Sequence, residues 1–212
     1  MKYPIGIQDF ESLRTNDYTY VDKTSLIYKL ANEGKYYFLS RPRRFGKSLL
    51  VSTLSAYFSG KRELFKGLEM EQLEKDWKKY PVMHLDLNTD KYDSKEVLEQ
   101  RLNLFLSDWE EDYGRNINEV TLSQRFEGII KRIAIKEGMP VVILVDEYDK
   151  PMLQAISNKE LQTAYRNTLK AFYGALKSQD KYIRFAFLTG VTKFGKVSVF
   201  SDLNNLIDIS MD

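Results

Sequence analysis

The segment from Val141 to Val145 is an unbroken run of aliphatic, mostly β-branched residues, and it narrows the choice of fold. Such a run suits a strand in the middle of a parallel sheet, where helices cover both faces. Because parallel strands are joined by crossover connections, helical patterns should lie between the strand patterns. They do, so the sequence predicts an α/β fold, a three-layer sandwich with a mainly parallel central sheet.

The other strands and helices are predicted from hydrophobic periodicity. Strand patterns lie at residues 36–40, 81–87, 183–188 and 206–209, and helical patterns at 24–33, 47–58, 98–109, 122–138 and 161–176. Asp93 or Ser94 is a plausible cap for the third helix, and Thr121 with Gln124 forms a capping box that opens the fourth. No repeat or linker interrupts the chain, so residues 1–212 are expected to form one domain.

Composition excludes several classes of protein. The 32 basic and 30 acidic residues nearly balance, which argues against a chain built mainly to coat nucleic acid. The absence of cysteine excludes disulfides, zinc fingers and thiol nucleophiles, and a single histidine, His84, excludes a His-rich metal site. We expect His84 to be packed in the core. No apolar run is long enough for a signal peptide or a membrane span, so we expect a cytoplasmic protein without membrane contact.

A phosphate-binding loop is predicted between the strand at 36–40 and the helix at 47–58. Gly46, Lys47 and Ser48 match the end of the pattern G-x-x-x-x-G-K-[ST], but Arg41 stands in place of the first glycine. A turn between a buried strand and a helix N-terminus directs backbone N–H groups at an anion. The motif therefore predicts a P-loop NTPase-like domain that binds ATP and Mg²⁺.

Each residue of the loop has an expected role. Lys47 would neutralise the β- and γ-phosphates, Ser48 would ligate Mg²⁺, and Gly46 would let the backbone approach the phosphates. Because Arg41 and Pro42 cannot easily adopt positive φ, the N–H groups from Arg44 to Ser48 should form the cradle. The residues assigned to nucleotide binding are Arg44, Phe45, Gly46, Lys47, Ser48 and Leu49. The alternative for the basic residues is a solvated loop, or contact with nucleic acid.

Two acids follow the central strand directly, Asp146 and Glu147. In an ATPase the first would hold Mg²⁺ and the second would activate the attacking water. The alternative is a strand that simply ends in solvent. Asp149 could add polarity to the site, but the start of the next turn is the favoured interpretation.

Thr189 follows the strand at 183–188 and fits the position of a polar sensor on a strand between the phosphate-binding loop and the acidic pair. It would contact the γ-phosphate or the attacking water, although a plain strand-to-loop transition explains it equally well. Arg166 and Arg184 are candidates for an arginine finger only because they are arginines.

The chain resembles the bacterial AAA-ATPase-like family, in which a P-loop domain is often fused to a PD-(D/E)XK nuclease-like domain. The resemblance covers nearly the whole chain. It rests on Gly6-Ile7-Gln8-Asp9-Phe10 with Tyr20-Val21-Asp22-Lys23-Thr24, on Arg41-Pro42-Arg43-Arg44-Phe45-Gly46-Lys47-Ser48, on Leu144-Val145-Asp146-Glu147-Tyr148-Asp149-Lys150-Pro151, and on Leu188-Thr189-Gly190-Val191-Thr192-Lys193-Phe194 with Leu203-Asn204-Asn205-Leu206.

The resemblance implies a Walker A motif at Gly46, Lys47 and Ser48 and a Walker B motif at Asp146 and Glu147. It also implies a helical lid and a nuclease-like domain beyond the last strand, so we expect this chain to be an N-terminal fragment without them. Nucleic acid is then a possible partner through the attached domain, and the oligomeric state is open. The expected function is Mg²⁺-dependent ATP hydrolysis that drives or switches that domain. The alternatives are a nucleotide switch without turnover, a nucleic-acid-binding module using Arg41 to Arg44, and a phosphotransferase.

Overall fold

The structure is a computed structural model that describes residues 2–193, 199–201, 203 and 205–210. Phe194 and Asn204, which contribute to the family resemblance, lie outside the described residues. In chain order the elements are α1 (Phe10–Thr15), α2 (Thr24–Glu33), β1 (Tyr36–Ser40), α3 (Lys47–Phe58), the 3-10 helix η1 (Arg62–Phe65), α4 (Glu69–Leu73), β2 (Val82–Asp86), α5 (Lys95–Tyr113), α6 (Leu122–Glu137), β3 (Val141–Asp146), α7 (Lys150–Gln154), α8 (Lys159–Tyr173), α9 (Ala175–Ser178), the 3-10 helix η2 (Asp180–Tyr182), β4 (Ile183–Gly190) and β5 (Ile207–Asp208).

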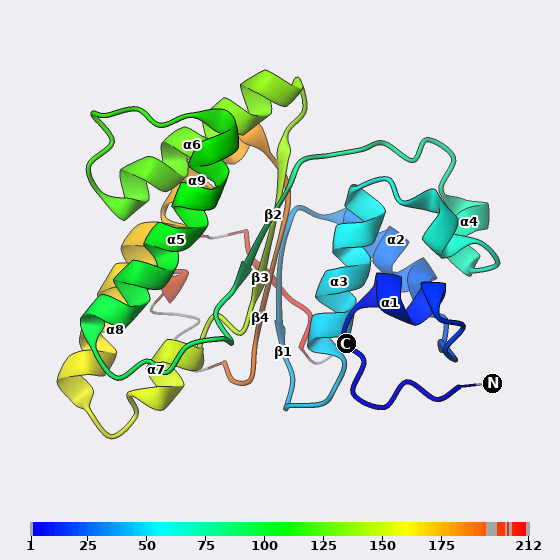
Figure 1. Ribbon diagram of the computed structural model, residues 1–212, viewed down its shortest axis with the longest axis horizontal. Coiled ribbons are helices and arrows are strands. Elements are labelled where there is room, and N and C mark those ends of the chain that lie inside the picture. Colours follow the sequence, from blue (N-terminus) through cyan, green and yellow to red (C-terminus); the bar gives the residue numbers. More distant parts are fainter. Residues whose placement is uncertain (1, 194–198, 202, 204, 211–212) are drawn as a thin grey trace.

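The described strands form a five-stranded sheet in the order β2-β3-β4-β1-β5, and every neighbouring pair is parallel. Helices α1 to α4 cover one face of this sheet, and α5, α6, α8 and α9 cover the other (Figure 1). The prediction of a three-layer α/β sandwich with a parallel sheet is therefore confirmed. The strand β4 separates β1 from β3, so the strand before the phosphate-binding loop and the strand before the acidic pair are not direct neighbours.

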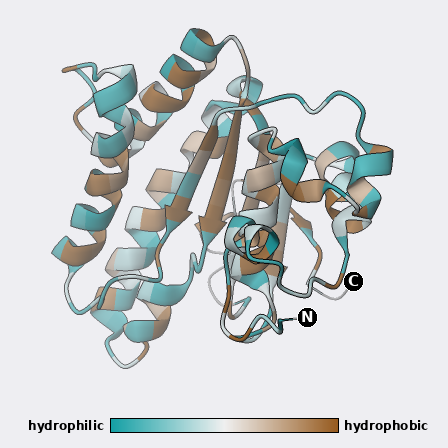
Figure 2. Ribbon diagram, turned by 45° about the vertical axis from the view of Figure 1, so that its right-hand side comes forward, coloured by the Kyte–Doolittle hydropathy of each residue, from teal (hydrophilic) through white to brown (hydrophobic). Residues whose placement is uncertain are grey.

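The pleat of the sheet divides the core into two clusters, because successive side chains of a strand point to opposite faces. In β3, Val141, Ile143 and Val145 pack against the cluster that includes α5, α6 and α8. Val142 and Leu144 pack against the cluster that includes α3. Both faces of the strand are buried, as the aliphatic run predicts, and the strands are the most uniformly apolar elements in Figure 2.

Several local predictions are confirmed. The helix α2, the strand β1 and the helix α3 have the bounds expected from periodicity. Thr121 and Gln124 form the predicted capping box of α6, and Gly138 ends that helix in a left-handed conformation at φ 64°. Ser94, one of the two proposed caps, occupies the N-cap position of α5, but its side chain makes no capping hydrogen bond.

Other predictions need correction. The helix expected over 161–176 is divided at Gly174 into α8 and α9. His84 is exposed, so its assignment to the core was wrong: it points to the same face of the edge strand β2 as the half-buried Val82, and the layer of α3 covers this face only in part, whereas Met83 and Leu85 on the other face are buried. The short helices α1, α4 and α7 were not predicted, because five or six residues are too few to show a helical period.

None of the helices formed by the described residues combines the length and the apolar character that crossing a bilayer requires.

Candidate functional site

The carboxyl ends of β1, β4 and β3 lie side by side at one edge of the sheet, and the loop from β1 to α3 lies at this edge (Figure 1). In open α/β sheets, ligands bind beyond the carboxyl ends of the strands. Asp146 is the last residue of β3, and Thr189 is the last but one of β4. Asp146 has the same side-chain direction as Leu144, and Thr189 the same as Phe187, so the pleat directs both towards the layer that contains α3.

The loop from 41 to 46 makes its turn with two left-handed residues, Arg44 at φ 68° and Gly46 at φ 76°. Neither Arg41 nor Pro42 is among the residues with positive φ, in line with the expectation from the sequence. An added Cβ at Gly46 would meet no atom within 4 Å, so glycine is favoured there by its backbone conformation and not by crowding. Phe45 is 69% exposed at the tip of the loop.

Helix α3 begins at Lys47, directly after this turn. The first N–H groups of a helix lack partners within the helix, and the helix dipole favours negative charge beside them. Ser48 and Leu49 are half-buried in the same first turn. The sequence from Arg44 to Leu49 thus combines the turn and the helix N-terminus of an anion-binding site.

Lys47 is only 4% exposed, and its ammonium group has three partners. Nζ lies 3.2 Å from Glu147 Oε1 and donates to the carbonyl oxygens of Arg41 at 3.0 Å and Pro42 at 3.2 Å. A buried charge is costly without such partners. The ion pair joins the start of α3 to Glu147 across the intervening strand β4.

Glu147 is held in an unusual environment. Its backbone is left-handed at φ 56°, a conformation that costs a non-glycine residue energy and that is often found at functional sites. Burial raises the pKa of its carboxyl group, Lys47 opposes this rise, and Asp146 and Asp149 add to it. A carboxylate with a raised pKa accepts protons more readily, which is the property required of a general base.

Thr189 connects the two acids. Its hydroxyl donates to Asp146 Oδ1 and accepts a hydrogen bond from the backbone N–H of Glu147 at 3.3 Å. Its carbonyl oxygen accepts from Tyr148 N at 2.9 Å. Thr189 is completely buried and Asp146 is 5% exposed, so the orientation of the acidic pair depends on this threonine.

Asp149 has more contacts than its sequence position indicates. It does begin the next turn, as expected, because it is the N-cap residue of α7. It is also completely buried, and its carboxylate accepts hydrogen bonds from Val191 and Thr192 at the end of β4. The only available sequence signal was that it is the third acid within four residues.

The two arginines proposed as fingers lie elsewhere. Arg184 is at the amino end of β4, opposite the site, where Nη2 donates to the carbonyl oxygen of Ala31 at 2.8 Å. Arg166 lies within α8, on the far side of the sheet from α3 (Figure 1).

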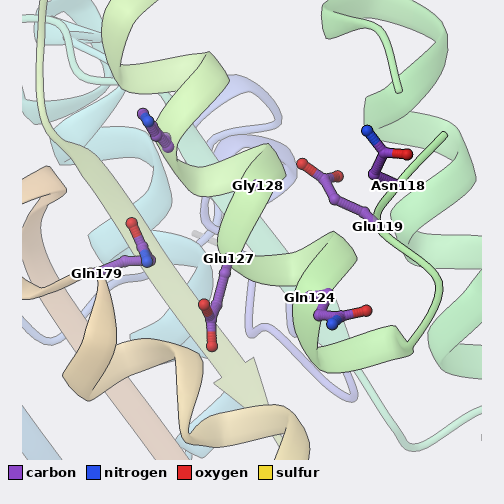
Figure 3. A pocket seen from close by; sticks show the side chains of 7 residues that line it. Asn118, Glu119, Gln124, Glu127, Gly128 and Gln179 are labelled. Carbon is purple, nitrogen blue, oxygen red and sulfur yellow. The ribbon is translucent and has the colours of Figure 1, made fainter. Parts of the chain in front are cut away.

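A surface hollow at α6 is also separate from the strand ends (Figure 3). It is lined by Asn118, Glu119, Gln124, Glu127, Gly128, Lys131 and Gln179. The hollow belongs to the layer of α5 and α6, whereas Lys47, Asp146 and Thr189 face the layer of α3.

The donor set at the strand ends fits Mg²⁺. The described residues contain no group of three His, Cys, Asp or Glu side chains that could hold a metal by themselves. Mg²⁺ prefers oxygen ligands and is usually held by one or two carboxylates together with substrate phosphates and waters. Ser48, in the first turn of α3, offers a hydroxyl, and Asp146, at the end of β3, offers a nearly buried carboxylate, which are the oxygen donors that this mode of binding uses.

Comparison with known proteins gives two matches. The model of a family described as "Predicted AAA-ATPase" matches residues 4–200. A curated relative from Azotobacter chroococcum mcd 1, the "Uncharacterized protein in vnfD 5'region", is 42% identical over 213 residues. The match covers all of this chain and 41% of the relative, so the chain spans about two fifths of that protein's length.

Proposed function

Because the chain belongs to the AAA-ATPase-like family, we propose that it binds ATP with Mg²⁺ at the carboxyl edge of the sheet and hydrolyses it to ADP and phosphate. Family membership by itself supports nucleotide binding in general. The observation that carries the proposal further is the 3.2 Å contact between Lys47 Nζ and Glu147 Oε1. This contact joins the proposed phosphate-binding group and the proposed base, which lie 100 positions apart in the sequence (147 − 47).

Binding begins with an exchange of partners at Lys47. The ammonium group of Lys47 is held by Glu147 and by two carbonyl oxygens. The β- and γ-phosphates together carry more negative charge than the single carboxylate of Glu147, and they bind an ammonium group more strongly than neutral carbonyl oxygens, because hydrogen bonds to ionised acceptors are about twice as strong as neutral ones. The β- and γ-phosphates therefore replace these partners, while the backbone N–H groups from Arg44 to Ser48, with Leu49 behind them, surround the phosphates.

Ser48 and Asp146 are the residues that hold Mg²⁺. When bound, the metal neutralises negative charge that develops on the phosphate oxygens. Thr189 donates to one carboxylate oxygen of Asp146 and so fixes the orientation of the group.

Release of Lys47 leaves Glu147 without its cation. Burial raises the pKa of its carboxyl group and the neighbouring acids add to the rise, so Glu147 can accept a proton from the attacking water. Thr189 lies between Asp146 and the backbone of Glu147, and in the proposal it positions the water or the γ-phosphate. Lys47, Glu147 and Thr189 thus serve as the catalytic residues.

The relative is longer than this chain, and the nucleotide cycle would act on the part of the protein that corresponds to the rest of the relative. We propose that ATP turnover drives or switches an attached domain, and that a nuclease-like domain in this position would bring nucleic acid as a partner. A helical lid outside residues 1–212 would complete the nucleotide site.

The test is a titration of Mg²⁺–ATP and Mg²⁺–GTP into the chain and into a version extended to the relative's length. We expect Mg²⁺-dependent ATP binding that weakens about 10- to 100-fold in Lys47→Ala, the effect of losing a charge-assisted hydrogen bond. Lys35→Ala is the matched control, since its ion pair with Asp180 lies at the opposite edge of the sheet. Glu147→Gln should bind ATP but lose turnover.

Three outcomes would redirect the proposal. Normal hydrolysis by Glu147→Gln would remove this residue from the mechanism. Tight binding without turnover in the extended wild-type protein would favour a non-catalytic switch. Salt-sensitive binding of nucleic acid that requires Arg43 and Arg44 but not Ser48 would favour the nucleic-acid module.

A further inference from the structure

The carboxylate of Asp149 links the segment that follows β3 to the segment that follows β4 through hydrogen bonds. The proposed binding of Mg²⁺–ATP assigns no role to this carboxylate. Oδ2 accepts from Thr192 N at 2.8 Å, from Thr192 Oγ1 at 2.9 Å and from Val191 N at 3.2 Å. Oδ1 accepts from Val191 N at 3.2 Å. These bonds hold Asp149, two residues after Glu147, against the segment that follows β4.

The same segment is bonded on its other side to the start of the phosphate-binding loop. Arg41 N donates to the carbonyl oxygen of Gly190 at 3.2 Å, and Ser40 Oγ donates to that of Val191 at 3.3 Å. Residues 190 and 191 therefore lie between Asp149 and the entry of the loop. A continuous set of hydrogen bonds crosses from the end of β3 to the end of β1.

The packing around Gly190 shows how close this contact is. A Cβ added at Gly190 would lie 2.6 Å from Tyr148 Cε1 and 2.8 Å from Asp149 Oδ1, closer than real Cβ atoms approach. Its φ is not in the left-handed region, so glycine is required here by space and not by backbone conformation. Tyr148 is completely buried between β4 and the aromatic ring of Phe38, at 5.5 Å between ring centroids.

We propose that Asp149 is a positioning residue that couples the acidic end of β3 to the entry of the phosphate-binding loop through residues 190–192. The hydrogen bonds of Asp149 fix the position of Arg41 and its loop relative to Glu147, which precedes Asp149 by two residues. The coupling concerns the chain itself; its effect on turnover rests on the proposed function.

Asp149→Asn is the sharpest perturbation, because it keeps the size of the side chain. Asparagine has one acceptor oxygen and places an NH₂ group against N–H and O–H donors, so the set of bonds from Val191 and Thr192 cannot be kept. Thr192→Val is a milder variant that removes the hydroxyl bond and leaves both backbone N–H donors. Asp180→Asn is the matched control, because this carboxylate also accepts side-chain hydrogen bonds, from Tyr36 and Lys35, but at the opposite edge of the sheet.

The first measurement is hydrogen exchange of backbone amides in the full chain without nucleotide. We expect Asp149→Asn to speed exchange about tenfold or more both at 191–192 and at Arg41, the change expected from losing about 1.4 kcal/mol of local protection. Thr192→Val should show a smaller increase at both places, and Asp180→Asn none at either. An increase confined to 191–192 would overturn the coupling.

The second measurement is turnover of Mg²⁺–ATP. We expect Asp149→Asn to lower kcat about tenfold or more with KM changed less than threefold, because Glu147 is misplaced while the phosphate-binding groups remain. A lower melting temperature with unchanged kcat for the folded protein would mean that Asp149 is only a structural support. If the wild-type protein neither binds nor hydrolyses ATP, the proposed function fails, while the exchange experiment still decides the coupling.

Discussion

Replacing Lys47 with methionine isolates the buried ion pair with Glu147. Methionine keeps much of the volume of lysine but removes the charge. At the observed 3.2 Å separation, the attraction is about 5 kcal/mol for an effective dielectric constant of about 20. Removing one partner of a buried pair usually costs about 3–5 kcal/mol, because the other charge is left without compensation.

Proton uptake limits this loss and makes it depend on pH. The pKa of Glu147 is already raised by burial, and without Lys47 it should rise further. A carboxyl group whose folded pKa lies above its unfolded value binds protons more tightly in the folded state. Stability is then lost as pH rises from the ordinary value of 4.5 through the raised folded pKa. The variant should therefore lose less stability at pH 5, where the carboxyl group can be protonated in the folded state, than at pH 8.

The assay is urea unfolding at pH 5, 6.5 and 8. We expect Lys47→Met to lose about 3 kcal/mol or more at pH 8 and much less at pH 5. The double variant Lys47→Met with Glu147→Gln should regain most of the loss at pH 8, because no buried charge is left at either position. Lys35→Met, which breaks the exposed pair with Asp180, should change stability by no more than about 1 kcal/mol.

Two results would refute this reasoning. The first is an equal loss of stability at pH 5 and pH 8, since a buried unpaired carboxylate must respond to protonation. The second is a double variant no more stable than Lys47→Met, which would show that the damage comes from lost packing.

Three further predictions concern other parts of the molecule. Turnover should increase as pH rises through the raised pKa of Glu147, since the base acts when ionised, and a pH profile of kcat should lose this limb in Glu147→Gln. Gly128→Ala should change the free energy of unfolding by no more than about 1 kcal/mol. The new Cβ would fall 1.9 Å from Glu119 Oε1, but this atom is the end of a flexible side chain that points at α6 in Figure 3 and can move aside, and alanine favours the helix. A loss of more than about 3 kcal/mol in urea unfolding would contradict this prediction. Gly190→Ala should lower the free energy of unfolding by about 1–3 kcal/mol, because the new Cβ would clash with the buried ring of Tyr148, and it should also reduce turnover. Full activity would show that residues 190–192 tolerate displacement.

Local patterns were sufficient for much of the fold. The bounds of α2, β1 and α3 follow from residues within each segment, since periodicity, caps and turn residues act over a few positions. The same holds for the candidate residues Lys47 and Asp146, because polar residues after a buried strand or at a helix start are visible in the sequence. The family resemblance rested on the same short motifs.

The contacts between these segments, in contrast, depend on the order of the strands in the sheet, which the local patterns do not give. His84 illustrates the difference: it lies on the edge strand β2, and the face that it shares with Val82 is only partly covered by the layer of α3, so its side chain is exposed, while Met83 and Leu85 on the other face are buried. No local pattern contains this information, because the cover over one face of an edge strand depends on how the helices pack on the assembled sheet.

The contacts of Asp149 and of the Lys47–Glu147 pair also depend on the arrangement of the whole sheet. The residue types and their order along the chain indicated a nucleotide site from the start. The 3.2 Å contact and the burial of Asp149 against Val191 and Thr192 arise only because β4 packs between β1 and β3. Parallel pairing of strands far apart in sequence brings these groups to one edge, and such pairing depends on the packing of the whole sheet.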